Sequence, residues 1–233
     1  TGQLLIYEQL FIYYIIYRSL PNNDIGDFMT EKEKMLTGKI YDASDEELKR
    51  FRETAHRLSR EYNLLDECDL NARAKILRAL LPNADKSAYL QGPVQFDYGI
   101  FTELGENFYA NFNLTVLDCA PVKIGNNVFI GPNCSLVTPV HPLLSRERKI
   151  IVRADGSVFA QEYAKPIIIG DDCWLATNVT VCGGAVIGRG CVIAAGSVVT
   201  GAIPPNSLAG GIPCKVIRTL SEKDSIELKK ELW

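Results

Sequence analysis

His141 is the residue in this sequence whose type and position best suit catalysis. The chain has two histidines, His56 and His141. Imidazole has an ordinary pKa near neutrality and so suits general base catalysis. His141 follows Val137-Thr-Pro-Val, the end of an expected strand, and precedes a long polar segment. Its backbone would therefore be fixed while its side chain reaches a cleft. The spacing fits a structural histidine at a turn equally well.

Three polar residues could share a site with His141. Asp97 lies in Phe96-Asp-Tyr-Gly, Asn111 in Phe108-Tyr-Ala-Asn-Phe-Asn, and Asp118 follows a strand expected at 114–117. Carboxylates and amides at such places could bind sugar hydroxyls, and they could equally be turn formers. With two histidines in the chain, a three-histidine zinc site is excluded, and we expect no metal.

The elements that would position these residues follow from a repeat of six. From Ile169 to Val199, every sixth residue is aliphatic, and four places later comes a small or β-branched residue. A period of six fits neither a helix nor a simple strand, and it is the signature of a parallel β-helix. Three six-residue repeats would close one triangular coil of eighteen residues. Cys173 and Cys191 are eighteen residues apart, so they should stack in adjacent coils.

The same repeat begins near Leu104 and is interrupted twice. Its phase slips by two at 121–123, and a charged segment at 141–165 must loop out of the coil. Long loops on rigid scaffolds are often functional. The chain is therefore expected to consist of an extension of unknown role at 1–28, a helical cap contributing to the acceptor site at 29–88, a β-helix domain at 89–220 with the loop at 141–165, and a C-terminal helix at 221–233.

The cap is expected to be helical because it carries helix signals. Ser44-Asp-Glu-Glu is a capping box, and an apolar stripe follows from Leu48 to Tyr62 at spacings of three and four. Asp69 would cap a second helix that Pro82 ends. His56 falls one place off the stripe, among charged neighbours. We expect it to be a solvated helix residue and not a catalyst.

Composition limits the class of protein and its location. The net charge is −3, without a basic run, so nucleic acid is a poor partner. Seven cysteines without a C-x-x-C pair indicate reduced thiols in a cytoplasmic protein. The apolar segment Leu4–Tyr17 is too short to span a bilayer and lacks the marks of a signal peptide. A membrane-associating segment is the minority interpretation there, and none is expected in 29–233.

Taken together and in order, six motifs resemble the maltose/galactoside O-acetyltransferase family. They extend from about Glu31 to Arg218. The motifs are Met35-Leu-Thr-Gly-Lys-Ile-Tyr-Asp with Asp45-Glu-Glu-Leu, Asn107-Phe-Tyr-Ala-Asn-Phe-Asn, Thr138-x-x-His-Pro, Glu162-Tyr-Ala-Lys-Pro-Ile, Ile169-Gly-Asp-Asp-Cys-Trp-Leu and Gly210-Gly-Ile-Pro-Cys-Lys.

The resemblance implies a left-handed parallel β-helix, a homotrimer, and acetyl-coenzyme A in the groove between neighbouring subunits. It implies direct acetyl transfer with His141 as general base and with oxyanion donors near Ala176–Thr177. It also implies two sets of binding residues. The sugar acceptor would meet Asp42, Asp97, Asn111 and Asp118, and the coenzyme would meet Trp174, Ala176, Thr177, Ala195, Thr200, Lys215 and Arg218.

Departures from the family pattern bear more on which sugar is the acceptor than on which reaction is catalysed. Cys119 stands where a relative has a second acid, and Asp97 stands where a relative has Ser. Maltose or glucose is the first expected acceptor and a galactoside the second. An antibiotic hydroxyl is a further alternative, against which Tyr41-Asp42 argues. A catalytically dead scaffold is the alternative from another class, because fold does not fix function.

Overall fold

The computed structural model describes residues 29–232 of the 233-residue chain. The predictions made for 1–28 and for Trp233 lie outside the described residues. The chain divides into two units, Thr1–Thr30 and Glu31–Trp233, and everything below concerns the second. Within the described part, no helix is long and apolar enough to cross a membrane.

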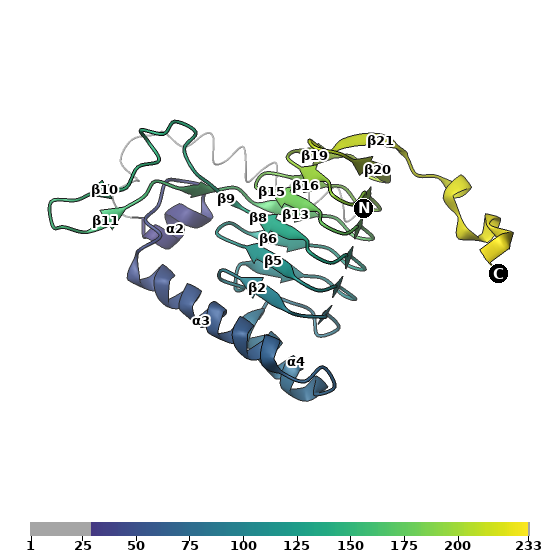
Figure 1. The fold of residues 1–233 in the computed structure, drawn as a ribbon, viewed down its shortest axis with the longest axis horizontal. Helices are drawn as coiled ribbons and strands as arrows, with labels where there is room; N and C mark the ends of the chain where they lie inside the picture. The colour runs from purple at the N-terminus through teal and green to yellow at the C-terminus, as the bar shows by residue number, and fades with distance from the viewer. Residues whose placement is uncertain (1–28, 233) are drawn as a thin grey trace. The chain divides into compact units, whose positions relative to one another are not determined.

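The second unit is built around a parallel β-helix, as the period of six predicts (Figure 1). Its short strands form three sheets. The first sheet contains β1 (Tyr89–Leu90), β4 (Tyr109–Ala110), β7 (Phe129–Ile130), β14 (Trp174–Leu175), β17 (Val192–Ile193), β20 (Ser207–Gly210) and β21 (Lys215–Thr219). The second contains β3 (Thr102–Leu104), β6 (Val122–Ile124), β13 (Ile167–Ile169), β16 (Val186–Ile187) and β19 (Ala202–Ile203). The third contains β2 (Val94–Phe96), β5 (Leu114–Leu117), β8 (Ser135–Val137), β15 (Thr180–Cys182) and β18 (Val198–Val199).

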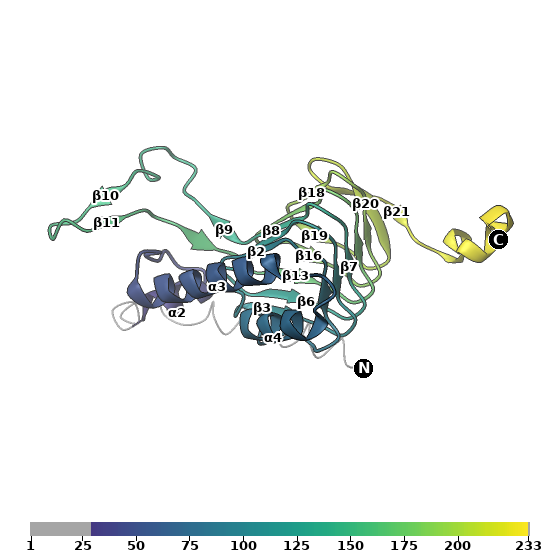
Figure 2. The same cartoon turned by 60° about the horizontal axis from the view of Figure 1, so that its bottom comes forward.

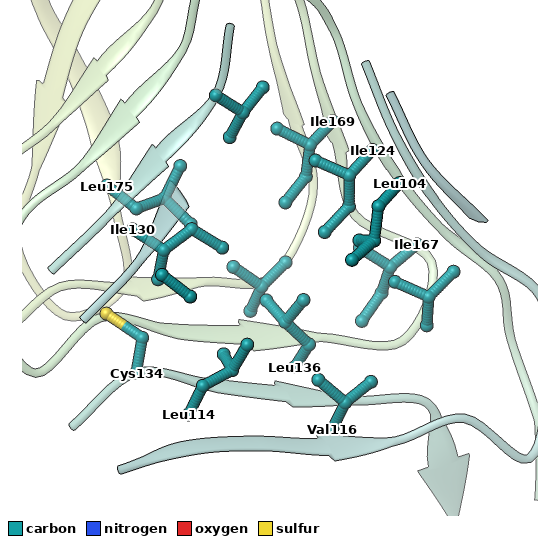
Figure 3. Packing of buried hydrophobic residues seen from close by; sticks show 14 of the residues in the cluster. Leu104, Leu114, Val116, Ile124, Ile130, Cys134, Leu136, Ile167, Ile169 and Leu175 are labelled. Carbon is teal, nitrogen blue, oxygen red and sulfur yellow. The ribbon is translucent and has the colours of Figure 1, made fainter. Parts of the chain in front are cut away.

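The core is the aliphatic column that the repeat predicts. Ile124 pairs with Leu104 on one side and Ile169 on the other, and Leu175 pairs with Ile130. All five side chains are buried and point into the coil (Figure 3). Burial of such side chains removes their apolar surface from water, which stabilises the stacked coils.

Coil length differs between the two ends of the solenoid. Leu104 pairs with Ile124, twenty residues along, whereas Ile169 pairs with Ile187, eighteen along. The two extra residues correspond to the phase slip at 121–123. They lie where the third sheet turns into the second, which is the corner that carries Asp118. At other corners, Asn107, Asn127 and Asp172 take positive φ, which Asn and Asp tolerate better than most residues.

Three helices precede the coils: α2 (Glu31–Leu36), α3 (Glu46–Leu64) and α4 (Leu70–Leu80). The N-cap of α3 is Asp45, whose side chain accepts from the Glu47 and Leu48 N–H groups, so the predicted Ser44 cap is wrong by one residue. Asp69 caps α4 as predicted. Helix α3 lies alongside β2 and thereby covers the first coil (Figure 2).

The segment predicted to loop out leaves the coil after β9 (Pro139–Val140) and returns at β12 (Tyr163–Ala164). These two strands pair antiparallel, with Tyr163 opposite Val140. Between them the chain forms a hairpin of β10 (Ile151–Val152) and β11 (Val158–Phe159), which extends from the solenoid as an arm (Figure 1). The arm is therefore anchored at a defined register beside His141.

The C-terminal helix predicted for 221–233 is wrong. Residues 222–232 form three separate 3-10 turns, Glu222–Asp224, Ile226–Leu228 and Lys230–Leu232, without a buried residue. Ile226, Leu228 and Leu232 are exposed, so no packed face stabilises a longer helix. The last coil is covered by β21, which pairs antiparallel with β20 and occupies its free edge.

Candidate active site

The predicted site residues lie along two different corners of the β-helix. We call the corner where the third sheet turns into the second the His141 edge; Asp97, Asp118, His141 and Thr200 lie on it, after β2, β5, β9 and β18. We call the corner where the first sheet turns into the third the Asn111 edge; it carries Asn111, Ala176, Thr177 and Ala195.

On the His141 edge, His141 faces Glu162. The antiparallel pairing of β9 with β12 places the two residues opposite each other, with His141 Nε2 3.8 Å from Glu162 Oε2. The His141 side chain is 54% exposed and that of Glu162 is 16% exposed. A carboxylate beside an imidazole can orient it and stabilise the imidazolium form. The sequence pattern does not predict this partner, although a strand returning to the coil at residue 163 would place residue 162 there.

Tyr41 connects this pair to the N-terminal segment. Its N–H donates to the Glu162 carbonyl at 3.2 Å, and its ring is 1% exposed. It packs with Met35, Leu48 and Cys119 in a small hydrophobic cluster at the His141 edge. Burial raises the pKa of the Tyr41 phenol. Residues far apart in sequence therefore meet at the base of the loop.

Asp97 has two neighbours on the same edge. Its Oδ1 lies 3.4 Å from His56 Nε2, and its Oδ2 is within 3.7 Å of Cys119 Sγ. The Asp97 side chain is 22% exposed. The prediction that His56 is a solvated helix residue is therefore incomplete, because one of its ring nitrogens faces this carboxylate.

Asp118 is fully buried. Its two oxygens accept hydrogen bonds from the Tyr98 N–H at 2.8 Å and the Thr102 hydroxyl at 2.9 Å. Burial raises the pKa of Asp118, although these hydrogen bonds oppose the shift. A carboxylate without exposed surface cannot contact an acceptor substrate directly. The expected acceptor contact of Asp118 is thus corrected to a supporting role at this turn.

Asp42 is engaged by the loop. Its Oδ2 pairs with the Arg153 guanidinium at 2.6 Å, and its Oδ1 accepts from the Ser44 N–H and hydroxyl. Partial burial alone would raise the pKa of Asp42, but the hydrogen bonds from Ser44 and Arg153 outweigh it and lower the pKa. The contact fastens the arm to the N-terminal segment, one residue from Tyr41.

The Asn111 edge carries a shallow apolar groove of about 300 Å³. Five residues predicted from the family pattern line it: Asn111, Trp174, Ala176, Thr177 and Ala195. Trp174 is 52% exposed and pairs in register with Phe129, whose ring in turn lies 6.0 Å from that of Tyr109. The groove therefore has an aromatic wall. A larger depression of about 520 Å³ at another corner contains none of the predicted residues.

Backbone geometry limits what each residue of the groove can donate. The Ala176 N–H donates to the Ile193 carbonyl at 2.9 Å, so it cannot serve as an oxyanion donor. Thr177 is the remaining donor of the predicted pair. Gly131 approaches it so closely that a Cβ there would lie 2.8 Å from the Thr177 nitrogen. A side chain at 131 would therefore displace the backbone of the groove.

The remaining coenzyme candidates lie apart from this groove. Thr200 is exposed on the His141 edge. Lys215 and Arg218 lie on β21, where the Arg218 guanidinium pairs with both carboxylate oxygens of Asp224 at 2.8 and 2.6 Å. This pairing lowers the pKa of Asp224 to about 2.

A single chain does not bring the two edges together. They lie at opposite ends of the strands of the third sheet, such as the four-residue β5, which at 3.3 Å per residue separates them by roughly 13 Å. His141 and Asp97 thus lie on one side, and Asn111 and Thr177 on the other. In residues 29–232, no group of three His, Cys, Asp or Glu side chains could hold a metal ion.

The fold and the two edges define a hexapeptide-repeat acyltransferase scaffold, and the comparisons identify its family. The maltose acetyltransferase hexapeptide capping motif matches residues 34–85, the bacterial transferase hexapeptide repeats match 166–201, and the hexapeptide repeat of succinyl-transferase matches 121–141. The chain is 36% identical to the galactoside O-acetyltransferase of Escherichia coli K12 over 84% of this chain and 92% of that one.

Two solved structures agree with this result. A maltose O-acetyltransferase from Clostridium difficile 630 is 40% identical, with a TM-score of 0.74 over 83% of this chain and 99% of that one. A hexapeptide-repeat acetyltransferase of Vibrio cholerae, solved with acetyl-coenzyme A, is 34% identical, with a TM-score of 0.71 over 83% of this chain and 100% of that one. The chain belongs to the maltose/galactoside O-acetyltransferase family of hexapeptide-repeat acetyltransferases.

Proposed function

We propose that this protein transfers the acetyl group of acetyl-coenzyme A to a hydroxyl of a sugar, with His141 as general base. The observation that carries the proposal is the pairing of His141 with Glu162 at the base of the loop, 3.8 Å apart. Acetyl-coenzyme A as co-substrate is supported by the complex of the Vibrio cholerae relative. A sugar acceptor is supported by the names of the maltose and galactoside relatives.

In the proposed reaction, the His141 imidazole takes the proton of the acceptor hydroxyl while that oxygen attacks the thioester carbonyl carbon. Glu162 stabilises the imidazolium that forms. The Thr177 N–H donates to the oxyanion of the tetrahedral intermediate. The carbon–sulfur bond then breaks, and His141 returns its proton to the leaving thiolate. The products are a sugar acetate and free coenzyme A, and no covalent enzyme intermediate is needed.

Asp97 and Asn111 are the proposed contacts of the sugar acceptor. The carboxylate of Asp97 lies on the His141 edge with part of its surface open, and the side chain of Asn111 lies at the groove. Asp42 is a contact of the acceptor only when Arg153 of the loop moves away from it, because that guanidinium covers it here. We place maltose or glucose before a galactoside as the acceptor.

The groove on the Asn111 edge is the proposed coenzyme site. Trp174 and Ala195 line an apolar wall suited to the pantetheine arm, and Lys215 supplies positive charge for phosphates. Arg218 would add to it only when its guanidinium leaves Asp224. Thr200, on the His141 edge, would meet the coenzyme from the other side. Metal ions have no part in the proposed mechanism.

The proposed site is completed between two copies of the chain. His141 and Thr177 must both reach the thioester, but one chain places them on different edges. A neighbouring copy that sets its Asn111 edge against the His141 edge would bring the two halves together. A homotrimer does this with three equivalent sites, because head-to-tail contacts can close into a ring.

The test is release of the coenzyme A thiol from acetyl-coenzyme A, with maltose, glucose, a β-galactoside and chloramphenicol as acceptors. The wild type should release thiol only when a sugar is present, and His141→Ala should lower kcat by about 10²- to 10⁴-fold. Release with chloramphenicol alone would make the acceptor an antibiotic. Saturable coenzyme binding without thiol release would contradict the proposal that the sugars tested are acceptors. If the protein neither binds the coenzyme nor releases thiol, it is a scaffold and not an enzyme.

A further inference from the structure

Helix α3 brings a second histidine to the proposed acceptor site. His56 Nε2 lies 3.4 Å from Asp97 Oδ1, across 41 residues of sequence. The contact follows from the packing of α3 along β2, since Asp97 is the first residue after that strand. The His56 side chain is 44% exposed, so solvent protons can reach its ring.

We propose that His56 is a positioning residue for Asp97 and makes acceptor binding depend on pH independently of His141. The inference rests on the proposed function, in which Asp97 receives hydroxyls of the acceptor. One carboxylate oxygen faces His56 and the other faces Cys119. The orientation of the carboxylate plane is therefore set by these two side chains.

The two neighbours of Asp97 differ in how they can respond to pH near neutrality. Histidine is the side chain that ordinarily titrates there, whereas burial raises the pKa of the Cys119 thiol and keeps it neutral. Tyr98, beside Asp97, is also kept neutral because burial raises the pKa of its phenol. A charged imidazolium attracts the Asp97 carboxylate, and a neutral ring holds it less firmly.

The other charged groups around His56 on its own helix are arginine and glutamate side chains. On α3 within about one turn are Arg52, Glu53, Arg57 and Arg60. Arg52 donates to the Tyr98 hydroxyl and the Ala43 carbonyl, both at 3.1 Å, and Arg57 pairs with Glu61 at 2.6 Å. From the coil, Asp97 is the charged group that faces the imidazole. Protonation of His56 is therefore the event that alters the charge next to Asp97.

Two histidines would then act in opposite directions. His141 must be neutral to accept a proton, so kcat rises with pH. His56 must be charged to hold Asp97, so the KM for the acceptor also rises with pH. The ratio kcat/KM for the acceptor should consequently rise less steeply with pH than kcat does, while the KM for acetyl-coenzyme A does not follow the titration of His56.

The test compares His56→Arg, which keeps a charge at every pH, with His56→Gln, which never carries one. Arg60→Gln, an exposed position on the same helix, is the control. From about pH 6 to 9, the wild-type acceptor KM should rise about three- to fivefold, as for a partly exposed ion pair. In His56→Arg the acceptor KM should stay low at every pH, and in His56→Gln it should stay high at every pH. The dependence of kcat on pH should be unchanged in both variants.

Failure of the inference can be told from failure of the proposed function. If the wild type releases thiol with a sugar and His56→Gln keeps the wild-type KM profile, His56 does not position Asp97 and the inference is overturned alone. If the wild type shows no acceptor-dependent release at any pH, the proposed function falls and the inference with it. Thermal unfolding of each variant shows that the compared proteins are folded. If His56→Arg is unfolded, the comparison of His56→Gln with the wild type is the test.

Discussion

Glu162 lies opposite His141 because β12 returns antiparallel to β9 at the base of the loop, with 3.8 Å between Nε2 and Oε2. The loop therefore supplies the partner of the proposed base. Changing Glu162 to Gln keeps the shape of the side chain but removes the charge that stabilises an imidazolium.

We expect Glu162→Gln to lower kcat by about tenfold and to leave the KM for acetyl-coenzyme A unchanged. Steady-state kinetics with the best sugar acceptor measure both. Glu147→Gln, in the same loop and exposed, is the matched control. An unchanged kcat in Glu162→Gln would mean that His141 works without this carboxylate.

The ion pair between Asp42 and Arg153 predicts how the arm responds to acid. Because the folded pKa of Asp42 is lowered, its contribution is present above the ordinary carboxyl value of about 4 and is lost as pH falls through the lowered value. Without Arg153 the ion pair is absent at every pH, so this acid-dependent loss should disappear.

Hydrogen–deuterium exchange of residues 142–162 between about pH 5 and pH 3, corrected for intrinsic rates, follows this contact. Arg153→Gln should exchange faster than the wild type at pH 5, and its corrected rate should not rise further as the pH falls. Arg146→Gln is the control, because Arg146 pairs within the loop with Glu147. Equal exchange in Arg153→Gln and the wild type would show that the arm is fastened elsewhere.

Arg73 joins the two helices to the first coil. Its guanidinium is 6% exposed and donates to the Tyr62 hydroxyl at 2.8 Å and the Leu90 carbonyl at 2.7 Å. It also lies 4.5 Å from the centre of the Tyr62 ring. Residues from α3, α4 and β1 thus meet at one buried cation.

Replacing Arg73 with Met should lower the free energy of unfolding by about 3 kcal/mol, because buried polar groups lose their partner. Arg78→Met, at an exposed position of α4, should change it by less than about 0.5 kcal/mol. Urea unfolding followed by circular dichroism measures both. A loss in Arg73→Met no greater than in Arg78→Met would show that the helices are held by apolar packing alone.

The repeat predicted the core because its period fixes which residues point inward. Ile130 and Leu175 stack as the sixes require, and Cys191 follows Cys173 in the next coil, as the pairing of Trp174 with Val192 shows. Positions on the groove, such as Trp174 and Thr177, were predicted from the family pattern and gather there.

What the sequence did not predict depends on contacts between distant segments. The approach of His56 to Asp97 requires knowing how α3 crosses the first coil, which a stripe of apolar residues does not specify. The burial of Asp118 goes with hydrogen bonds from the Tyr98 N–H and the Thr102 hydroxyl, which lie 20 and 16 residues earlier in the chain. The tail after Ser221 carries helix signals but has no surface to pack against, so local propensity misled the prediction.

The central claim is that the His141 edge of one copy and the Asn111 edge of another form one acetyl-transfer site. The most direct measurement mixes two variants, His141→Ala, which lacks the base, and Ala195→Trp, which fills the groove. Each alone should be inactive. Mixed trimers assembled from equal amounts and isolated through two different tags should recover roughly a third of wild-type activity, because one site in three combines an intact edge from each variant. Mixed oligomers that form but release no coenzyme A with the sugar acceptor would contradict the shared site.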